Sequence, residues 1–401
     1  MEWPIVKLGD ISELITKGTT PTSVGFKFTE TGINFIKVES ITKSGTFLSS
    51  KFTAISEDCN EALKRSQLKV GDVLFSIAGA LGRTALVTQD ILPANTNQAL
   101  AIIRLKSDLE IDKRFLMLAL TTGVTLEQVN KHKGGVAQQN LSLGQLKTFE
   151  IPLPPIQEQK RIVAILDQAF ADIDKARALT EENLKNAREL FESYLQQVFS
   201  QRGEDWSQRT LGDLGKVSMC KRILKKQTSE SGDIPFFKIG TFGKKPDAYI
   251  SKDIYDDFRA KYSFPKTGDI LISASGTIGR RVIYDGEPAY FQDSNIVWID
   301  NDESLVLNDY LYHFYSICDW NPSKGATISR LYNDDLRAIK ISFPSIQRQR
   351  ELVNKITVLY PQVQDLQILY KKKLTALEEL KKSLLQKAFS GELTKNKQEA
   401  A

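Results

Sequence analysis

Ile151-Pro-Leu-Pro-Pro-Ile-Gln-Glu-Gln159 stands directly before a long run of helical periodicity, and it recurs as Ile341-Ser-Phe-Pro-Ser-Ile-Gln-Arg-Gln349 before a second such run. Four further stretches recur in the same order along the chain. They begin at Trp3, Ile33, Gly71 and Leu195 in the first copy and at Trp206, Ile234, Gly268 and Leu385 in the second. Ordered matches of this kind indicate an internal duplication of the whole chain.

A seam of apolar residues follows the motif in each copy. The apolar positions alternate steps of three and four residues, which is the heptad spacing of a coiled coil. The buried face of a helical bundle has a similar stripe, but its length in both copies favours a long antiparallel pair. Pro361 lies inside the second seam and is expected to kink or locally break that helix. The predicted helix–helix interface consists of Val163, Leu166, Phe170, Ile173, Leu184, Phe191 and Tyr194 with Val353, Ile356, Tyr360, Val363, Tyr370, Leu374, Leu377 and Leu384.

The residues ahead of each motif contain β-branched and aromatic runs separated by Gly, Pro and Asn, which is typical of short strands. Residues 73–77, 99–103 and 269–273 are expected strands, and residues 115–120 and 310–315 are expected short helices. The predicted fold class is α+β: two mixed α/β domains at opposite ends of an antiparallel pair of long helices, in pseudo-two-fold relation. The expected boundaries are domain 1 at 1–154, a long helix with a connector at 155–204, domain 2 at 205–344, a second long helix at 345–391 and a disordered tail at 392–401.

The composition narrows the class of protein. The chain has 401 residues, of which 41% are hydrophobic and 26% charged, and a net charge of +5. A mildly positive charge permits nucleic-acid binding without requiring it. No run approaches the ~20 apolar residues of a membrane helix, and the first ten residues lack the pattern of a signal peptide. Since the three cysteines are scattered, we expect reduced thiols in a cytoplasmic protein.

The sequence contains no recognisable catalytic or metal centre. His132 and His313 are the two histidines, and neither has a second His or Cys at the spacing of a zinc site. The stretches 79–83 and 276–280 have glycines in a loop pattern but lack the Gly-Lys-Ser/Thr of a phosphate-binding loop. Structural turns are expected there, and a close approach of the backbone to DNA phosphate stays open as the alternative. No Asn-Pro-Pro-Tyr/Phe motif and no Ser/His/Asp or Cys/His centre is present. We therefore assign no catalytic residue and no metal, and predict that the chain is not an enzyme on its own.

The stretch 154–167 and the closing Leu385-Gln-Lys-Ala-Phe-Ser-Gly-Glu-Leu393 resemble the helical regions of the specificity (S) subunits of type I restriction–modification systems. Trp-x-x-x-x-Leu-Gly-Asp at the start of each copy and Gly-Asp-Val/Ile-Leu within it resemble their target-recognition domains. The resemblance covers essentially the whole chain, and the second copy departs from it with Ser345 in place of the second proline.

The resemblance implies a subunit that reads a bipartite, asymmetric target in double-stranded DNA, one half-site per domain, with the coiled coil setting the spacer. It implies two methyltransferase (M) subunits and restriction (R) subunits as partners. S-adenosylmethionine, ATP and Mg²⁺ would belong to those partners, and no cofactor is expected in this chain. Two alternatives stay open: the recognition subunit of a system whose partner is a fused nuclease–methyltransferase, and a coiled-coil scaffold without DNA specificity.

The residues expected to bind DNA lie in polar and basic loops between the predicted strands. Lysines there would neutralise phosphates, and Gln138, Gln139, Arg222 and Arg330 have the donors for bidentate contacts to base edges. Solvated turns have a similar composition and stay open as the alternative. The expected DNA-binding residues are Lys17, Thr19, Thr20, Ser23, Arg83, Lys131, Lys133, Gln138 and Gln139 in domain 1 and Arg222, Lys225, Lys226, Lys244, Lys245, Arg280, Lys324, Thr327, Ser329 and Arg330 in domain 2.

Overall fold

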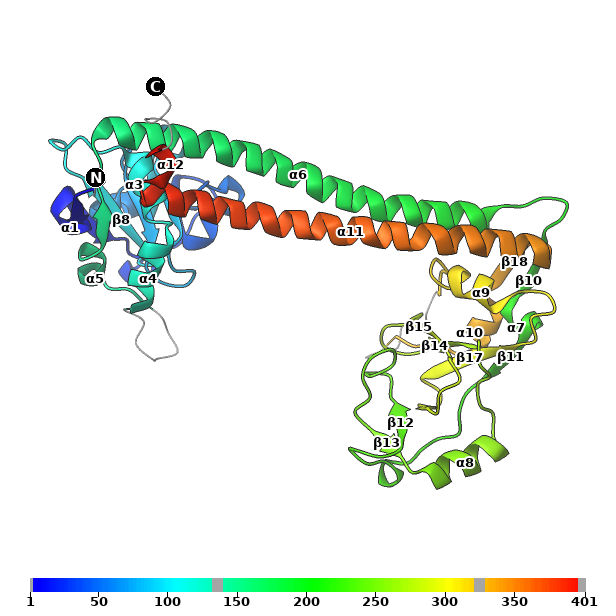
Figure 1. The fold of residues 1–401 in the computed structure, drawn as a ribbon. Coiled ribbons are helices and arrows are strands. Elements are labelled where there is room, and N and C mark those ends of the chain that lie inside the picture. Colours follow the sequence, from blue (N-terminus) through cyan, green and yellow to red (C-terminus); the bar gives the residue numbers. More distant parts are fainter. Residues whose placement is uncertain (1–2, 132–139, 321–328, 396–401) are drawn as a thin grey trace. The chain divides into compact units, whose positions relative to one another are not determined.

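The computed structural model describes residues 3–131, 140–320 and 329–395 (Figure 1). The chain forms two compact units, one of residues 1–180 with 373–401 (unit 1) and one of residues 181–372 (unit 2). Each unit therefore contains one globular domain together with parts of both long helices.

The two long helices are α6 (Ile156–Ser200) and α11 (Ile346–Phe389). Pro155 precedes α6, and its carbonyl accepts a hydrogen bond from the amide of Glu158. Ser345 stands at the same place before α11, where its hydroxyl accepts from the amide of Arg348, so a side-chain cap replaces the proline. Of the kink or local break expected at Pro361, the break is wrong, because α11 continues through this residue. Pro361 lacks a donor for the carbonyl four residues earlier, but Ile356 and Val363 are buried on either side of it.

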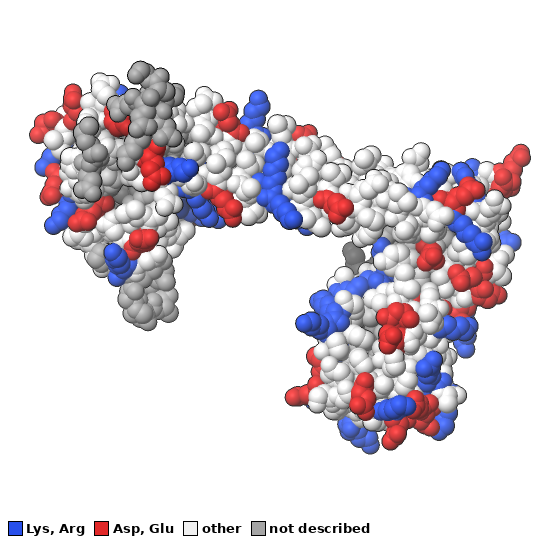
Figure 2. Space-filling model, viewed as in Figure 1, with Lys and Arg blue, Asp and Glu red and all other residues white. Residues whose placement is uncertain are grey.

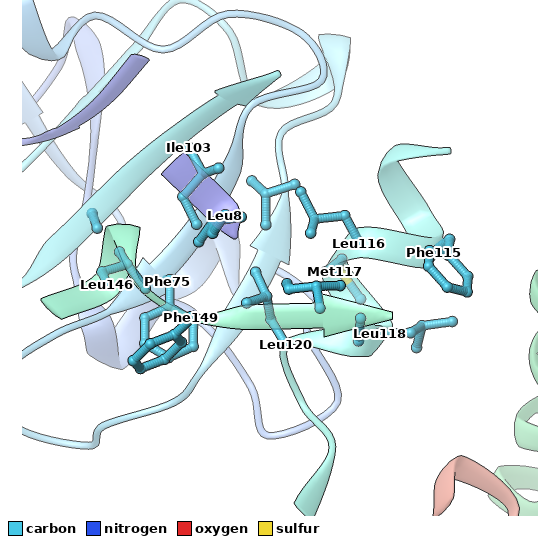
Figure 3. Close-up of a cluster of buried hydrophobic side chains, with 14 of the residues drawn as sticks. Leu8, Phe75, Ile103, Phe115, Leu116, Met117, Leu118, Leu120, Leu146 and Phe149 are labelled. Atoms are coloured by element: carbon cyan, nitrogen blue, oxygen red, sulfur yellow. The ribbon is translucent and has the colours of Figure 1, made fainter. Parts of the chain in front are cut away.

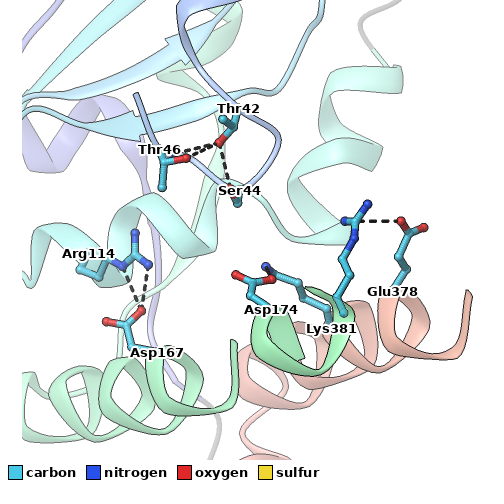
Figure 4. A network of polar contacts seen from close by, with 9 residues as sticks. Thr42, Ser44, Thr46, Arg114, Asp167, Asp174, Glu378 and Lys381 are labelled. Carbon is cyan, nitrogen blue, oxygen red and sulfur yellow. Dashed lines mark hydrogen bonds and ion pairs between the residues drawn. The ribbon is translucent and has the colours of Figure 1, made fainter. Parts of the chain in front are cut away.

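The helices are antiparallel in unit 1, as the charged contacts show (Figure 4). Lys381 contacts Asp174 at 3.3 Å and Arg177 contacts Glu378 at 3.8 Å, so the numbering rises on one helix as it falls on the other. The Nζ of Lys381 also lies 4.6 Å from the ring centre of Phe170. In unit 2 the rings of Phe191 and Tyr360 meet at 5.4 Å.

The globular part of unit 1 is built around a four-stranded antiparallel sheet in the order β2-β8-β5-β6. A three-stranded sheet, β4-β3-β7, and the pair β1-β9 complete it. The strands are β1 (Ile5–Lys7), β2 (Ser12–Lys17), β3 (Ile33–Ile36), β4 (Thr53–Ile55), β5 (Val73–Ser76), β6 (Thr84–Leu86), β7 (Ala94–Thr96), β8 (Leu100–Leu105) and β9 (Glu150–Pro152). The short helices are α1 (Leu8–Ile11), α2 (Glu57–Ala62), α3 (Lys113–Ala119), α4 (Gly123–Lys131) and α5 (Leu143–Lys147).

Unit 2 repeats this topology, with the sheets β11-β17-β14-β15 and β13-β12-β16 and the pair β10-β18. The predicted duplication is therefore confirmed at the level of strand order, as is the α+β class with two mixed domains. The strands are β10 (Ser207–Thr210), β11 (Gly215–Ser218), β12 (Ile234–Phe237), β13 (Tyr249–Ile250), β14 (Ile270–Ser273), β15 (Arg281–Ile283), β16 (Tyr290–Phe291), β17 (Ile296–Asn301) and β18 (Lys340–Phe343). The short helices are α7 (Leu211–Leu214), α8 (Lys252–Lys261), α9 (Asn308–Phe314) and α10 (Asn333–Ala338).

Strand alternation explains how the main sheet of unit 1 fills two cores. Val73 and Phe75 of β5 face one cluster, whereas Leu74 between them faces another. Figure 3 shows the first cluster, in which Phe75 lies beside Phe149. Successive side chains of a strand point to opposite faces, so an unbroken apolar run indicates a strand that is buried on both sides.

Each domain also packs against the end of the long helix from the other repeat. In unit 1, Phe389 near the end of α11 lies 5.0 Å, ring to ring, from Phe115 of α3. In unit 2, Phe199 near the end of α6 lies 4.8 Å from Tyr310 of α9. Phe115 and Tyr310 are fully buried. Burial of a large aromatic side chain contributes roughly 1.5–3 kcal/mol, so these contacts are major anchors of the helix ends.

The expected disordered tail is wrong for its first residues. Residues 392–395 form a helical turn, α12 (Glu392–Lys395). Gly391 has a φ of +78°, a left-handed conformation that suits glycine and turns the chain at the end of α11. Leu393 then packs on the core of unit 1 and Thr394 is buried. Residues 396–401 lie outside the described part of the chain.

Candidate DNA interface

Three loops of domain 1 meet at one edge of its four-stranded sheet, together with Leu141, whose amide donates to the carbonyl of Ile77 at 2.8 Å. β2 and β5 end there and β8 begins there, since Lys17 pairs with Ala101 and Ser76 with Leu100. The amide of Gly18 donates to the carbonyl of Asn97 at 3.1 Å, which joins two of the loops. We call residues 17–23, 77–83, 97–99 and 140–141 the strand-end edge of domain 1.

Two segments of the backbone, at Gly18 and at Thr96, pass very close to each other at this edge. A Cβ on Gly18 would lie 1.9 Å from the carbonyl oxygen of Thr96, so no larger residue fits. Just beyond, the hydroxyl of Thr20 donates to Oε1 of Gln98, and Ser23 donates to the carbonyl of Thr20 at 2.7 Å. Lys17 is exposed and Thr19 half-buried. The edge therefore presents a hydroxyl–amide pair next to a lysine.

Domain 2 has the corresponding edge, formed by residues 219–222, 274–280, 293–295 and 329–331. The amide of Ala274 donates to the carbonyl of Asn295 at 2.7 Å, and the amide of Leu331 to the carbonyl of Ala274 at 2.9 Å. Nε of Arg222 donates to Asp293 at 2.8 Å, and Nη2 of Arg330 donates to the carbonyl of Ser294 at 3.2 Å. Two arginines predicted from separate loops thus converge on one short loop.

The loop between them has an unusual backbone. Ser294 has a φ of 54°, a left-handed conformation that few residues with a side chain adopt and that is held only where neighbours fix it. Arg330 binds its carbonyl, and next to it Ser275 donates to Oδ1 of Asn295 at 2.8 Å. The side chain of Arg222 is 66% exposed, so its remaining donors face solvent. A loop held by several hydrogen bonds and an exposed arginine beside it are the features of a preformed binding site.

The other predicted DNA-binding residues in the described chain lie on exposed segments. Lys131 is the last residue of α4, and Lys225 and Lys226 begin a short 3₁₀ helix, η6 (Lys225–Gln227). Lys244, Lys245 and Ser329 are exposed in loops. The remaining predictions lie outside the described residues: Lys133, Gln138, Gln139, Lys324 and Thr327.

Arg83 and Arg280 point inward, which favours a structural role over the predicted contact with DNA. Nη1 of Arg83 donates to the carbonyls of Val38 at 3.2 Å and Ile41 at 2.8 Å. Nη1 of Arg280 donates to the carbonyl of Phe242 at 2.9 Å. Each arginine therefore ties the turn after the central strand to the segment after β3 or β12.

Gly82 and Gly279, which directly precede these arginines, allow the backbone to form the turn. Gly82 and Gly279 have φ values of 81° and 80°, and a Cβ on Gly279 would lie 2.3 Å from Nε1 of Trp320. The structural-turn interpretation of these loops therefore agrees with their geometry.

The predicted seam residues are buried or half-buried with one exception. Tyr360 is 46% exposed, although its ring contacts Phe191. Leu166, Phe170, Ile173, Val353, Ile356 and Val363 are buried, and Val163, Leu184, Phe191, Tyr194, Tyr370, Leu374, Leu377 and Leu384 are half-buried.

The surface charge is mixed. Figure 2 shows basic and acidic side chains interspersed on the visible face of each unit rather than gathered by sign. Burial raises the pKa of the Cys220 thiol, at the edge of domain 2, to about 12, so this thiol is protonated at neutral pH. Among the described residues no group of three His, Cys, Asp or Glu side chains is placed to hold a metal ion. Nor does any helix in this part of the chain combine the length and apolarity that crossing a membrane requires.

Sequence reasoning missed Asp293, Asn295 and Ser275, which complete the edge of domain 2. A signal was present. Asp293-Ser-Asn295 directly precedes β17 in the second copy, as Asn97-Gln98 precedes the expected strand at 99–103 in the first. Alignment of the two copies would have drawn attention to both loops.

Comparison with known proteins agrees with this architecture. The family model for the type I restriction modification DNA specificity domain matches residues 1–182 and 203–379. A putative type I restriction enzyme specificity subunit of Haemophilus influenzae is 52% identical over 224 residues, which cover 55% of this chain and 58% of that protein. The chain thus matches little more than half the length of this relative. The EcoBI specificity subunit of Escherichia coli is 24% identical over 357 residues, 80% of this chain and 74% of that protein.

Solved structures share the fold. A chain from a structural study of assembly and conformational transition in the type I R-M system aligns with a TM-score of 0.78 at 22% identity, over 98% of both chains. The HsdS subunit from Thermoanaerobacter tengcongensis aligns with a TM-score of 0.62 at 20% identity, over 98% of this chain and 97% of that one. Since the family model covers both copies of the repeat, the chain belongs to the type I restriction–modification DNA specificity family.

Proposed function

We propose that the chain is the non-catalytic DNA-reading subunit of a type I restriction–modification complex and that each domain reads one half of a bipartite, asymmetric target. The observation that carries this proposal is the pair of strand-end edges. Both edges have the same backbone hydrogen bond, from Leu141 to Ile77 in one and from Leu331 to Ala274 in the other. Thr20 donates to Gln98 in the first edge, whereas Arg222 donates to Asp293 of the corresponding loop in the second. Equivalent positions with different donors suit two half-sites of different sequence.

The chemistry of the two edges fits base recognition. Arginine donates two hydrogen bonds to guanine, glutamine pairs with adenine, and lysine neutralises phosphates. Arg222 and Arg330 are therefore assigned to base edges in domain 2, and Gln98 is added to the candidates in domain 1. Lys17, Lys131, Lys225 and Lys226 are assigned to the DNA backbone.

The long helices would set the distance between half-sites. Domain 1 precedes the start of α6 and domain 2 follows its end, and α6 has 45 residues. At ~1.5 Å per residue such a helix is about 67 Å long, which is about two turns of B-DNA at ~34 Å each. The helix pair would therefore act as the spacer of the recognition site.

The proposed partners and cofactors are those that membership of the family implies. Two methyltransferase (M) subunits and restriction (R) subunits would assemble on this chain in the cytoplasm. S-adenosylmethionine, ATP and Mg²⁺ would be bound by those partners, and the target adenine would leave the base stack to enter an M subunit. This division of labour agrees with the absence of a recognisable catalytic motif in the sequence.

A genome-wide map of methylated adenine tests the proposal. Cells with the partner M subunit are compared with and without this chain, and a split, asymmetric motif is expected only with it. Replacing residues 1–154 by the corresponding domain of a relative should change one half-site alone. An assembled complex that methylates no motif, or whose DNA binding does not depend on salt, would favour the scaffold function instead.

A further inference from the structure

The repeated motif contains two glutamines with different surroundings. Gln157 and Gln347 are exposed at the start of α6 and α11. Gln159 and Gln349, two residues later, are only 1% and 0% exposed. A buried amide side chain must satisfy both its donor and its acceptor, so the partners of the second glutamine indicate what it does.

Gln159 joins three parts of unit 1. Its Oε1 accepts from the amide of Asp112 at 2.9 Å, and its Nε2 donates to the carbonyl of Pro154 at 2.8 Å. Asp112 in turn caps α3 through the amide of Phe115 at 2.9 Å. The side chain therefore connects the first turn of α6, the segment that leads into it and the start of a helix in domain 1.

Gln349 makes the same connections in unit 2. Its Oε1 accepts from the amide of Leu307 at 2.9 Å, and Leu307 is the residue before α9. Its Nε2 donates to the carbonyls of Pro344 at 2.9 Å and Leu305 at 2.8 Å. The side chains around it differ between the repeats, since Ser345 replaces Pro155 and Leu307 replaces Asp112. The glutamine, its bond from a domain amide and its bond to the proline carbonyl before the helix are nevertheless the same, and Gln349 adds the bond to Leu305.

We propose that Gln159 and Gln349 are positioning residues that fix the angle at which each domain meets its helix, and thereby the spacing at which the two half-sites are read. This inference rests on the proposed function. Apolar packing between a domain and a helix is non-directional, whereas hydrogen bonds on two sides of one buried amide resist both tilt and rotation.

The length of the helix makes the angle important. A tilt of about 3° at one end of a helix about 67 Å long displaces the other end by about 3.5 Å. This displacement is at right angles to the helix axis and is as large as the rise of one base pair, ~3.4 Å. A junction held to within a few degrees is therefore needed to keep the second domain aligned with its half-site at one spacer length.

The test uses the chain in complex with its methyltransferase partner. Binding is measured on duplexes that carry both half-sites with the natural spacer, one base pair fewer and one more. Gln159→Met and Gln349→Met remove the hydrogen bonds at nearly constant volume, and Gln157→Met and Gln347→Met at the exposed positions are the matched controls. Wild type and controls should prefer one spacer by at least about tenfold, and the buried variants should prefer it by less than about threefold.

A second variant separates positioning from folding. Gln159→Glu keeps the size and the acceptor for Asp112 and loses the donor to Pro154, and we expect intermediate spacer selectivity. Thermal unfolding of each complex is recorded in parallel. Equal loss of affinity on all three spacers, with selectivity unchanged, would show a merely structural role and overturn the inference. A wild-type complex without spacer preference would overturn the proposed function as well.

Discussion

Asp72 and Arg104 form a bidentate ion pair inside domain 1. Nε and Nη2 of Arg104 donate to the two carboxylate oxygens of Asp72, each at 2.7 Å. The side chain of Asp72 is fully buried and that of Arg104 is 17% exposed. The corresponding residues of domain 2 are Asp269, directly before β14, and Asp300, the fifth residue of β17. One repeat thus has an ion pair where the other has two carboxylates. Burial, with a smaller contribution from Asp300, raises the pKa of Asp269.

Replacing Arg104 should strongly destabilise domain 1. Arg104→Leu leaves the carboxylate of Asp72 buried without its cation, which costs about 3–5 kcal/mol of unfolding free energy. Denaturant titration measures the loss. The control is Lys64→Ala, which removes an exposed pair with Glu61 and should cost less than about 1 kcal/mol. Equal effects of the two variants would contradict the assignment.

Asp300→Arg should create in domain 2 the pair that domain 1 already has. Asp269 would gain a partner for its buried carboxylate, and a charge-assisted hydrogen bond contributes about 1.5–3 kcal/mol. The exposed pair between Lys266 and Asp300 would be lost at little cost. Thermal unfolding of Asp300→Arg is compared with Asp300→Asn, which only removes the neighbouring charge. The prediction fails if the arginine variant is no more stable than the asparagine variant.

Two leucines of α6 should differ sharply in their contribution to stability. Leu166 is 0% exposed and Leu179 is 53% exposed. Leu166→Ala creates a cavity and should cost about 2–5 kcal/mol, whereas Leu179→Ala should stay within about 0.5 kcal/mol. Both are measured by equilibrium unfolding of the whole chain. A small effect at Leu166 would mean that the first part of the seam is not held in place.

Arg222→Ala should weaken recognition of one half-site only. Loss of a bidentate arginine costs about 1–3 kcal/mol at the base it reads, a decrease in affinity of about 5- to 150-fold. Methylation by the complex is compared on DNA substituted at each position of both half-sites. Arg209→Ala is the control, because Arg209 is exposed on β10, away from the strand-end edge. Relaxed specificity in the half-site of domain 1 would contradict independent reading.

The free energy of unfolding should decrease as the pH falls from about 6.5 to 4. Burial, with a contribution from Arg281, lowers the pKa of His313 from 6.5 to about 4. Between these values the unfolded chain binds a proton that the folded chain does not, so protonation favours unfolding. After allowance for solvent screening the effect is on the order of 1–2 kcal/mol. Unfolding of His313→Asn across this range should show a smaller slope, and an unchanged slope would exclude this histidine as its source.

The long-range periodic features of the fold could be predicted from the sequence. The predicted seams lie in helices of 45 and 44 residues, α6 and α11, and the apolar runs around Val73 and Ile270 form the central strands as expected. Such patterns are detectable because burial imposes a period on the side chains. The contacts of the helix ends with the opposite repeat were not predictable, because Phe199 and Phe389 are far in sequence from Tyr310 and Phe115.

The candidate site was only partly predictable, because composition does not give the direction of a side chain. Arg222 and Arg83 are both basic residues in loops, yet one is 66% exposed and the other donates to buried carbonyls. Gln157 and Gln159 differ in the same way. A single sequence shows which residues have suitable donors, whereas the backbone decides whether those donors face solvent or the interior.

The helix ends have a topological consequence. Trp3 and Leu393 pack against the same core, and Gly391 lies so close that a Cβ on it would be 3.5 Å from the ring of Trp3. The equivalent junction in the middle of the chain, Gly203 beside Trp206, is covalently continuous. The beginning and the end of the described chain therefore lie close together in unit 1. A chain closed by a short linker beyond residue 395 and reopened at residue 203 would carry the two domains in reverse order around an unchanged framework.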